Sequence, residues 1–384
     1  MHSTSVILIG FMPNPRIYKR IALEKQIGDV HLICWDRGDS MLSVPAEDGY
    51  TAHVIPINAG GNPLKRLIPY AKFSKATAEL LNEIHPDLIH VQGLDMLKIA
   101  CDYKKHANHK VKIIYEVADL HRLLVDRQKS LIAKAAQKYL RFMDRRLEGK
   151  YDLLVITSMR YYEVYFKDFV SKEKILYMPN VPDLSAFSTY HHKSKEEPFV
   201  VGYLGSVRYK QQMIHLIDAA EKTGIHLLIA GYEDQPKIIE PLCKGKPNIK
   251  WIGRFDFNTQ AAELYRECDV MYSVYNADMH NVRVALPNKL YEAVYCEMPL
   301  IVAKNTYLAQ VVEDWGVGIA VDHNSVDELV EAINELRQNA DLREQIAENC
   351  RKHKQELDLR QYNNVLKERI LKIWGENVGK DNSI

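Results

Sequence analysis

Short apolar runs alternate with amphipathic segments along the whole chain, and this alternation restricts the fold more than any other feature of the sequence. Runs such as 5–10 and 111–116 are apolar on nearly both faces, as strands buried inside a parallel sheet must be. The intervening segments, such as 72–84 and 211–223, have helical periodicity. This pattern predicts an α/β protein with doubly wound parallel sheets. The expected strands are 5–10, 30–35, 51–56, 87–91, 111–116, 152–157, 174–178, 199–204, 226–230, 249–252, 269–274, 299–303 and 318–321.

A largely polar stretch without periodicity interrupts the alternation once, after which it restarts. At 384 residues the chain is long enough for two domains. We therefore expect a Rossmann-like domain over 1–184, a linker over 185–198 and a second Rossmann-like domain over 199–357. The last segment, 358–384, has helical spacing and no strand after it, so it can pack back on the first domain. Ligands of such sheets bind beyond the carboxyl ends of the strands, which predicts a site in a cleft between two facing domains.

Composition and missing motifs exclude several classes of protein. The formal net charge of +1 indicates no nucleic-acid partner, so any anion site must be local. The six scattered cysteines are typical of a reducing compartment, and neither a signal peptide nor an apolar run of roughly 20 residues is present. We therefore expect a cytoplasmic protein. The sequence also lacks a P-loop, HExxH, DxD and GxSxG, which argues against ATP hydrolysis, a catalytic metal and a serine hydrolase.

The segment 281–302, NVRVALPNKLYEAVYCEMPLIV, carries the strongest indication of a ligand site. Pro287 can open a helix, because its missing N–H would have no partner in the first turn. Asn288, Lys289 and Glu292 then lie within about one turn of that opening, where unpaired N–H groups attract anions. Adding a lysine for phosphate charge and a carboxylate for sugar hydroxyls gives a nucleotide-sugar site. An ordinary surface helix explains the same residues equally well.

Two further loops of the second half can contribute to the same site. Gly205, Arg208 and Lys210 follow the strand expected at 199–204. The glycine allows close approach of a ligand, and the two cations can neutralise a diphosphate, although a basic turn in water is the alternative. Together with Lys289, they favour phosphate binding. The polar loop that ends at Asn281 is placed to contact the transferred sugar, or it is only a long connection.

In the first half, polar residues follow two expected strands. Arg16 lies near a helix start, where the macrodipole favours acids, so it contacts an acceptor or a phosphate, or is a solvated surface residue. The single glycine of this loop argues against a dinucleotide fingerprint. Glu116, Asp119 and His121 follow the apolar run from Val111 to Tyr115 and can bind hydroxyls or act in acid–base chemistry. A helix cap is the alternative for Asp119.

Residues 122–150 carry nine Lys or Arg against three Asp or Glu. Basic residues recur at helical spacing beside an apolar stripe of Ile132, Ala136, Tyr139, Met143 and Leu147. Such a helix can bind an anionic membrane surface, which would make the protein peripheral on the inner face of the membrane. The alternative is a helix with its stripe in the core and its charges in water.

These loops, in this order, resemble the GT-B glycosyltransferases, specifically the retaining glycosyltransferase family 4. The segments that carry the resemblance are PNPRIYKRIALEKQIGDVHLICWDR, HPDLIHVQGLDMLKIA, KIIYEVADLHRL, DLLVITSMRYYEVY, YMPNVPD, LGSVRYK, GRFDFNTQAAELYRECDVMYSVYN and PNKLYEAVYCEMPLIV. The last segment is similar to a subgroup found among cell-surface polysaccharide enzymes. The resemblance implies two Rossmann-like domains facing across a cleft. It also implies metal-independent transfer of a hexosyl or related sugar, with retention, from a nucleotide diphosphate-sugar to an acceptor hydroxyl.

The family pattern also implies roles for particular residues. The second domain would bind the donor, for which a UDP-sugar is favoured and no cofactor is needed, and the first would bind a glycan or lipid-linked acceptor. The expected catalytic residues are Arg208, Lys210 and Asp119. The expected donor-binding residues are Gly205, Asn281, Asn288, Lys289, Leu290 and Glu292, the last as the ribose-binding glutamate. The expected acceptor-side residues are Arg16, Glu116 and His121, and no metal ligand is expected.

Three positions depart from the family pattern. Val284 stands where the family usually has the first glutamate of its Glu-x7-Glu motif, and Ala118 where many relatives have histidine. Glu297 replaces a common glycine, which costs roughly 1 kcal/mol if its backbone is left-handed. The first two departures motivate one alternative, a non-catalytic GT-B binding or scaffold partner. A second alternative, a GT-B sugar-nucleotide epimerase, shares the same fold.

Overall fold

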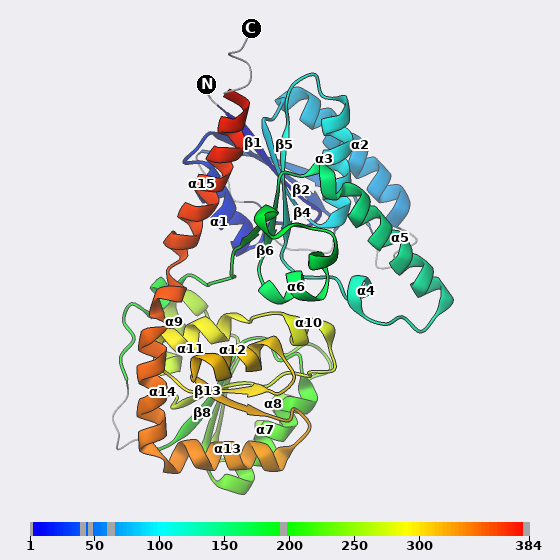
Figure 1. Ribbon diagram of the computed structural model, residues 1–384. Coiled ribbons are helices and arrows are strands. Elements are labelled where there is room, and N and C mark those ends of the chain that lie inside the picture. Colours follow the sequence, from blue (N-terminus) through cyan, green and yellow to red (C-terminus); the bar gives the residue numbers. More distant parts are fainter. Residues whose placement is uncertain (1–2, 39–43, 45–48, 60–65, 193–197, 379–384) are drawn as a thin grey trace. The chain divides into compact units, whose positions relative to one another are not determined.

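The computed structural model describes residues 3–38, 44, 49–59, 66–192 and 198–378, and these residues form two compact units (Figure 1). Unit 1 comprises Met1–Pro179 and Arg360–Ile384, and unit 2 comprises Asn180–Leu359. Each unit is an α/β structure built on one parallel sheet, and each is described by itself below.

Unit 1 contains a seven-stranded sheet in the order β3-β2-β1-β4-β5-β6-β7. Every neighbouring pair is parallel. The strands are β1 (Thr4–Ile9), β2 (Asp29–Asp36), β3 (Thr51–Pro56), β4 (Leu88–Gln92), β5 (Lys112–Val117), β6 (Leu153–Ile156) and β7 (Ile175–Tyr177). The strand order reverses between β1 and β4, and a sheet of this type leaves a crevice at the carboxyl ends of such strands.

Helices cover both faces of this sheet, as Figure 1 shows. The helices of unit 1 are α1 (Pro15–Glu24), α2 (Leu67–Ile84), α3 (Leu94–His106), α4 (Arg122–Val125), α5 (Leu131–Leu147), α6 (Met159–Val164) and α15 (Leu359–Val378). The C-terminal helix α15 belongs to this unit, because Leu366, Ile370 and Ile373 are buried against Leu88 and Ile114 of the sheet.

Unit 2 repeats the arrangement with a six-stranded sheet in the order β10-β9-β8-β11-β12-β13. Its strands are β8 (Val200–Leu204), β9 (His226–Ala230), β10 (Ile249–Gly253), β11 (Val270–Ser273), β12 (Leu300–Ala303) and β13 (Gly318–Val321). Its helices are α7 (Lys210–Thr223), α8 (Ile239–Cys243), α9 (Phe257–Arg266), α10 (His280–Val284), α11 (Asn288–Tyr295), α12 (Tyr307–Trp315), α13 (Val326–Gln338) and α14 (Ala340–Lys352). The order reverses between β8 and β11, so the expected ligand crevice of this sheet lies there.

The predicted fold class of two doubly wound parallel sheets is confirmed, and every expected strand coincides with an observed one within a residue or two. The chain crosses between the units at 179–180, earlier than the expected linker at 185–198. Phe187 explains the difference, because it is buried against the rings of Phe257, Tyr265 and Tyr295 and therefore fastens this segment to unit 2. Residues 193–197 of the expected linker lie outside the described residues. Among the described helices, none is long and apolar enough to span a membrane.

Candidate functional site

Unit 1 contains a pocket of about 470 Å³ at the carboxyl ends of its central strands. Its walls come from the segments after β1, β2, β4 and β5, together with Leu124 of α4 and Leu140 of α5. The pocket therefore lies where the strand order reverses, the position at which such sheets bind ligands.

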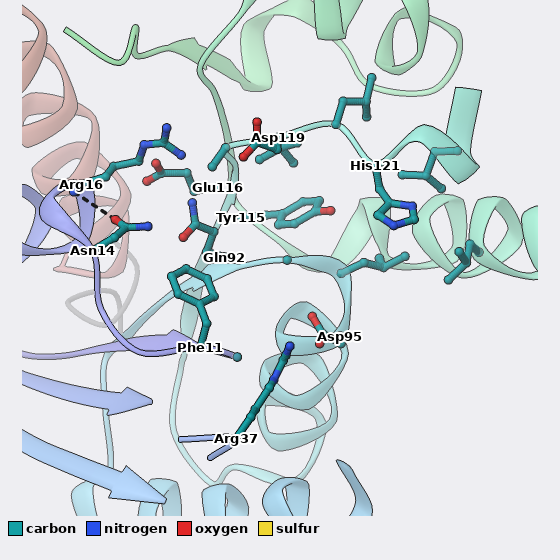
Figure 2. Close-up of a pocket in the computed structure, with 18 residues that line it drawn as sticks. Phe11, Asn14, Arg16, Arg37, Gln92, Asp95, Tyr115, Glu116, Asp119 and His121 are labelled. Carbon is teal, nitrogen blue, oxygen red and sulfur yellow. Dashed lines mark hydrogen bonds between the residues drawn. The ribbon is translucent and has the colours of Figure 1, made fainter. Parts of the chain in front are cut away.

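All four polar residues predicted after β1 and β5, Arg16, Glu116, Asp119 and His121, line this pocket (Figure 2). Arg16 is placed by the start of α1, where the Asn14 side chain accepts hydrogen bonds from the amides of Arg16 (3.0 Å) and Ile17 (3.3 Å). Figure 2 shows the Arg16 and Glu116 side chains at one end of the pocket and His121 at the other.

Glu116 belongs to a buried ion cluster that also contains Arg20, Glu24 and His90. The Arg20 guanidinium donates to both Glu116 oxygens, at 2.8 and 3.3 Å. His90 bridges the two carboxylates, with Nδ1 2.7 Å from Glu24 and Nε2 3.1 Å from Glu116. Burial opposes the charge on His90, but its hydrogen bonds to Glu116 and Glu24 outweigh burial and raise its pKa to about 9. Burial likewise opposes the charge on Glu116, yet Arg20 and His90 hold the pKa of this carboxyl well below its usual value.

Two hydroxyl groups fix the backbone of the loop after β5. The carbonyl of Ala118 accepts hydrogen bonds from the hydroxyls of Thr157 (2.7 Å) and Tyr161 (3.3 Å), which fixes the backbone next to Asp119. His121 caps α4, because its Nδ1 accepts a hydrogen bond from the amide of Leu123 at 3.2 Å. Its proton therefore lies on Nε2, and the ring can donate a hydrogen bond to a ligand from that atom.

In unit 2 two of the residues expected in the donor site, Gly205 and Lys289, lie together where the strand order reverses. Gly205 follows β8 with φ = 135°, which only glycine adopts readily, and a Cβ there would lie 2.9 Å from Nζ of Lys289. Lys289 is buried at the start of α11, with Nζ 4.7 Å from the ring centre of Tyr203 and 5.9 Å from that of Tyr275. Burial opposes the charge on Lys289, but Tyr275, Tyr203 and Glu292 raise its pKa above the ordinary value. The ammonium group of Lys289 therefore lies beside the backbone of Gly205, which carries no side chain.

Glu292 lies one turn further along α11 and is also buried. The Tyr265 hydroxyl of α9 donates to its Oε2 at 2.5 Å. Burial raises the pKa of Glu292, whereas Lys289 and Tyr265 lower it to a smaller degree. The carboxylate is therefore oriented by a buried phenol and a buried cation.

The remaining predicted residues of unit 2 have other contacts. Lys210 donates to the carbonyls of Asp234 and Pro236, and its Nζ lies 3.6 Å from Glu233. Asn288 accepts a hydrogen bond from the Asn180 side chain at 3.0 Å.

Leu290 is fully buried in the core of unit 2. Arg208 lies in the loop between β8 and α7, and Asn281 is the second residue of α10. The roles expected for these five residues stay predictions.

Comparison with known proteins agrees with this architecture. Sucrose-phosphate synthase from Thermosynechococcus elongatus superposes with a TM-score of 0.72 at 16% identity, covering 97% of this chain and 100% of that chain. The Anabaena protein Alr3699/HepE in complex with UDP superposes with a TM-score of 0.68 at 15% identity, covering 96% and 100%. The succinoglycan biosynthesis protein ExoL of Rhizobium meliloti (strain 1021) is 22% identical in an alignment of 334 residues that covers 83% of this chain and 81% of ExoL.

The sequence model of the glycosyl transferases group 1 matches residues 188–353, nearly all of unit 2. The matched residues therefore form a glycosyltransferase domain, and the chain is an enzyme with the GT-B fold. The resemblance to the GT-B glycosyltransferases is therefore confirmed, as is the expectation of an enzyme, while the family 4 assignment and retention stay predictions. Glu297, which replaces a common glycine of the family, has φ = 54°, so its backbone is left-handed.

Several residues of this glycosyltransferase escaped the sequence analysis. Tyr265 holds Glu292 from a position 27 residues earlier, and no local pattern links the two. Arg20 lies on the amphipathic helix α1 and His90 in the apolar strand β4, and both are buried, where charges require partners. Arg37 and Asp95 also line the pocket of unit 1, and Figure 2 shows the Arg37 side chain extending toward Asp95.

Proposed function

We propose that this glycosyltransferase moves a sugar from a UDP-sugar to an acceptor hydroxyl during polysaccharide biosynthesis, with retention at the anomeric carbon and without a metal ion. The name of ExoL supports the biosynthetic context, and the complexes of Alr3699/HepE with UDP and with UDP-glucose support the donor. The family 4 assignment and the retaining course rest on the sequence motifs.

One observation carries the proposal, namely the position of the Lys289 ammonium group beside Gly205 in unit 2. A diphosphate placed against this glycine would approach the backbone closely and lie within reach of a buried positive charge. The charge that develops on the departing diphosphate would then be stabilised by a cation already fixed in place, with Arg208 and Lys210 as candidates for additional charge. Glu292, oriented by Tyr265, would accept the two ribose hydroxyls.

The pocket of unit 1 is the proposed acceptor site, for a glycan or a lipid-linked acceptor. It combines apolar walls with two arginines and three carboxylates, a mixture that suits the faces and hydroxyls of a sugar. These residues are Arg16, Arg37, Asp95, Glu116 and Asp119. Asp119 and His121 are the proposed contacts to the reacting hydroxyl. The expectation of a cytoplasmic location stays a prediction.

Donor binding is tested by thermal unfolding with UDP, ADP and GDP, because a ligand that binds only the folded state raises the melting temperature. We expect UDP to stabilise the parent protein most and to lose its effect in Lys289→Met and Glu292→Gln. Lys222→Met is the matched control, since this lysine lies in an exposed ion pair with Asp327. Equal stabilisation of all variants by UDP would refute the assigned donor site.

Turnover is tested by release of UDP from a panel of UDP-sugars, with and without glycan acceptors. The loss of the fixed cation in Lys289→Met should lower the rate constant about 100-fold or more. Binding without turnover would favour the non-catalytic alternative, and conversion of donor without any acceptor would favour the epimerase. Activity that disappears with EDTA and returns with Mg²⁺ would contradict the metal-independent mechanism, and an inverted linkage in the product would contradict retention.

A further inference from the structure

The helix α5 has an unusual distribution of side chains. Its outer face exposes four large apolar residues, Leu131 (82% exposed), Ile132 (84%), Tyr139 (60%) and Phe142 (56%). Lys134, Lys138, Arg145 and Arg146 are exposed on the same turns of the helix. We call these eight residues the α5 face.

Two polar side chains on the inner side of α5 attach the helix to its neighbours. Gln137 donates to the carbonyls of Leu123 and Asp126, both at 2.8 Å, and Arg141 donates to the carbonyl of Leu124 at 2.6 Å. These bonds attach α5 to α4 and its flanking loop, so they fix which face points outward. A helix exposed only to water normally places its large apolar residues inward, whereas α5 exposes four of them in addition to Leu140 and Leu147 on its inner side.

The apolar stripe that the sequence indicated is therefore divided. Leu147 is buried and Met143 is partly buried, but Ile132 and Tyr139 are exposed. A second exposed apolar pair, Leu67 and Ile68, begins α2.

We infer that the α5 face binds an anionic lipid surface. Charge complementarity selects this partner, since residues 122–150 carry nine Lys or Arg against three Asp or Glu while the chain as a whole is nearly neutral. Apolar side chains flanked by lysine and arginine match the boundary between acyl chains and anionic headgroups. The long basic side chains can reach phosphates while Leu131, Ile132 and Phe142 enter the apolar layer.

The position of α5 connects this surface to the site. Leu140, on the inner side of the same helix, lines the pocket of unit 1. An α5 face bound to lipid would therefore hold this pocket at the lipid surface. If unit 1 takes the acceptor, a point that rests on the proposed function, the acceptor is one presented by that surface.

The test is co-sedimentation of the full chain with vesicles of phosphatidylcholine containing phosphatidylglycerol, compared with phosphatidylcholine alone. We expect binding to the anionic vesicles that weakens as salt rises, because the Debye length falls from about 10 Å at 0.1 M to about 3 Å at 1 M. Neutralising Lys134 and Lys138 by Lys→Gln changes should weaken binding about 30-fold, at about fivefold per basic residue. Ile132→Ser with Phe142→Ser should also abolish most of the binding.

Matched controls are available on the same unit. Lys105 and Lys372 are exposed outside the α5 face, and Leu371 and Val365 are partly exposed apolar residues of α15. The double variants Lys105→Gln/Lys372→Gln and Leu371→Ser/Val365→Ser should bind vesicles as the parent does.

Three results would overturn the inference. They are the absence of vesicle binding, equal loss in the control variants, and a dimer in sedimentation velocity that Ile132→Ser/Phe142→Ser dissolves while vesicles are not bound. Stabilisation by UDP, measured on the same variants, should stay unchanged, and this separates failure of the lipid inference from failure of the donor assignment.

Discussion

Asp144 offers a quantitative test of how α5 is attached to unit 1. Its side chain is fully buried on the inner side of the helix, near Tyr115, Tyr151 and Tyr165. Burial raises the pKa of Asp144 to about 6, from 3.8 in water, while the Tyr165 hydroxyl and Arg145 lower it to a smaller degree. Ionising this carboxyl is therefore less favourable in the folded protein than in the unfolded chain, so its charged form destabilises the fold.

Asp144→Asn removes this charge but keeps the shape and an oxygen that can accept a hydrogen bond from a phenol. The difference between the two pKa values corresponds to about 3 kcal/mol at 1.36 kcal/mol per pKa unit. This cost is absent below pH 3.8, reaches about half its full value at pH 5 and is complete above pH 7. Asp144→Asn should therefore stabilise unit 1 by about 3 kcal/mol at pH 8 and by about half as much at pH 5.

Calorimetry can follow this effect as the melting transition of unit 1. For a domain of this size, 3 kcal/mol corresponds to a rise of roughly 6–12 °C. Asp102→Asn, an exposed residue paired with Lys98, is the control and should change stability by less than about 0.5 kcal/mol. A lower melting temperature of Asp144→Asn at pH 8, or a gain that does not depend on pH, would refute the assignment of a buried charge.

Three further predictions concern the buried ion cluster, the donor site and the strained backbone. Glu116→Gln should destabilise unit 1 by about 3–5 kcal/mol in denaturant unfolding, and the loss should shrink above pH 9, because the contribution of His90 is full below pH 6.5 and disappears as the pH rises through about 9. Tyr265→Phe should weaken UDP binding about tenfold in titration calorimetry, because the carboxylate of Glu292 loses its hydroxyl donor; unchanged affinity would give the hydroxyl a purely structural role. In thermal unfolding, Glu297→Gly should have a free energy of unfolding within about 1 kcal/mol of the parent, because relief of the left-handed backbone offsets the lost ion pairs. Glu297→Ala should be about 1 kcal/mol less stable than Glu297→Gly.

The strands could be predicted from the sequence because a buried parallel strand must be apolar over four to six consecutive residues. The position of the crossing between the units could not, because 183–192 is largely polar and one side chain, Phe187, decides to which unit it belongs. Boundaries of this kind depend on a few tertiary contacts.

The candidate site was predictable to a different degree in each unit. In unit 2 the spacing within PNKLYE places Lys289 and Glu292 one turn apart, so local periodicity was sufficient. The buried partners of these residues, and of Glu116, lie far away in the sequence. The outward direction of the α5 face was not predictable either, because it follows from hydrogen bonds of Gln137 and Arg141 to backbone carbonyls.

The return of α15 to unit 1 has a consequence for how the chain is made. The core of unit 1 includes Leu366, Ile370 and Ile373, which a ribosome adds only after all of unit 2 has been synthesised. Unit 2 is continuous from Asn180 to Leu359 and can fold while the nascent chain is still attached. Although unit 1 is synthesised first, the apolar groove that α15 covers stays exposed until the end of synthesis. Premature termination near residue 360 would therefore release a molecule with a complete second domain and an aggregation-prone first one, and an expression tag at the C-terminus would be attached to the last element that closes the first domain.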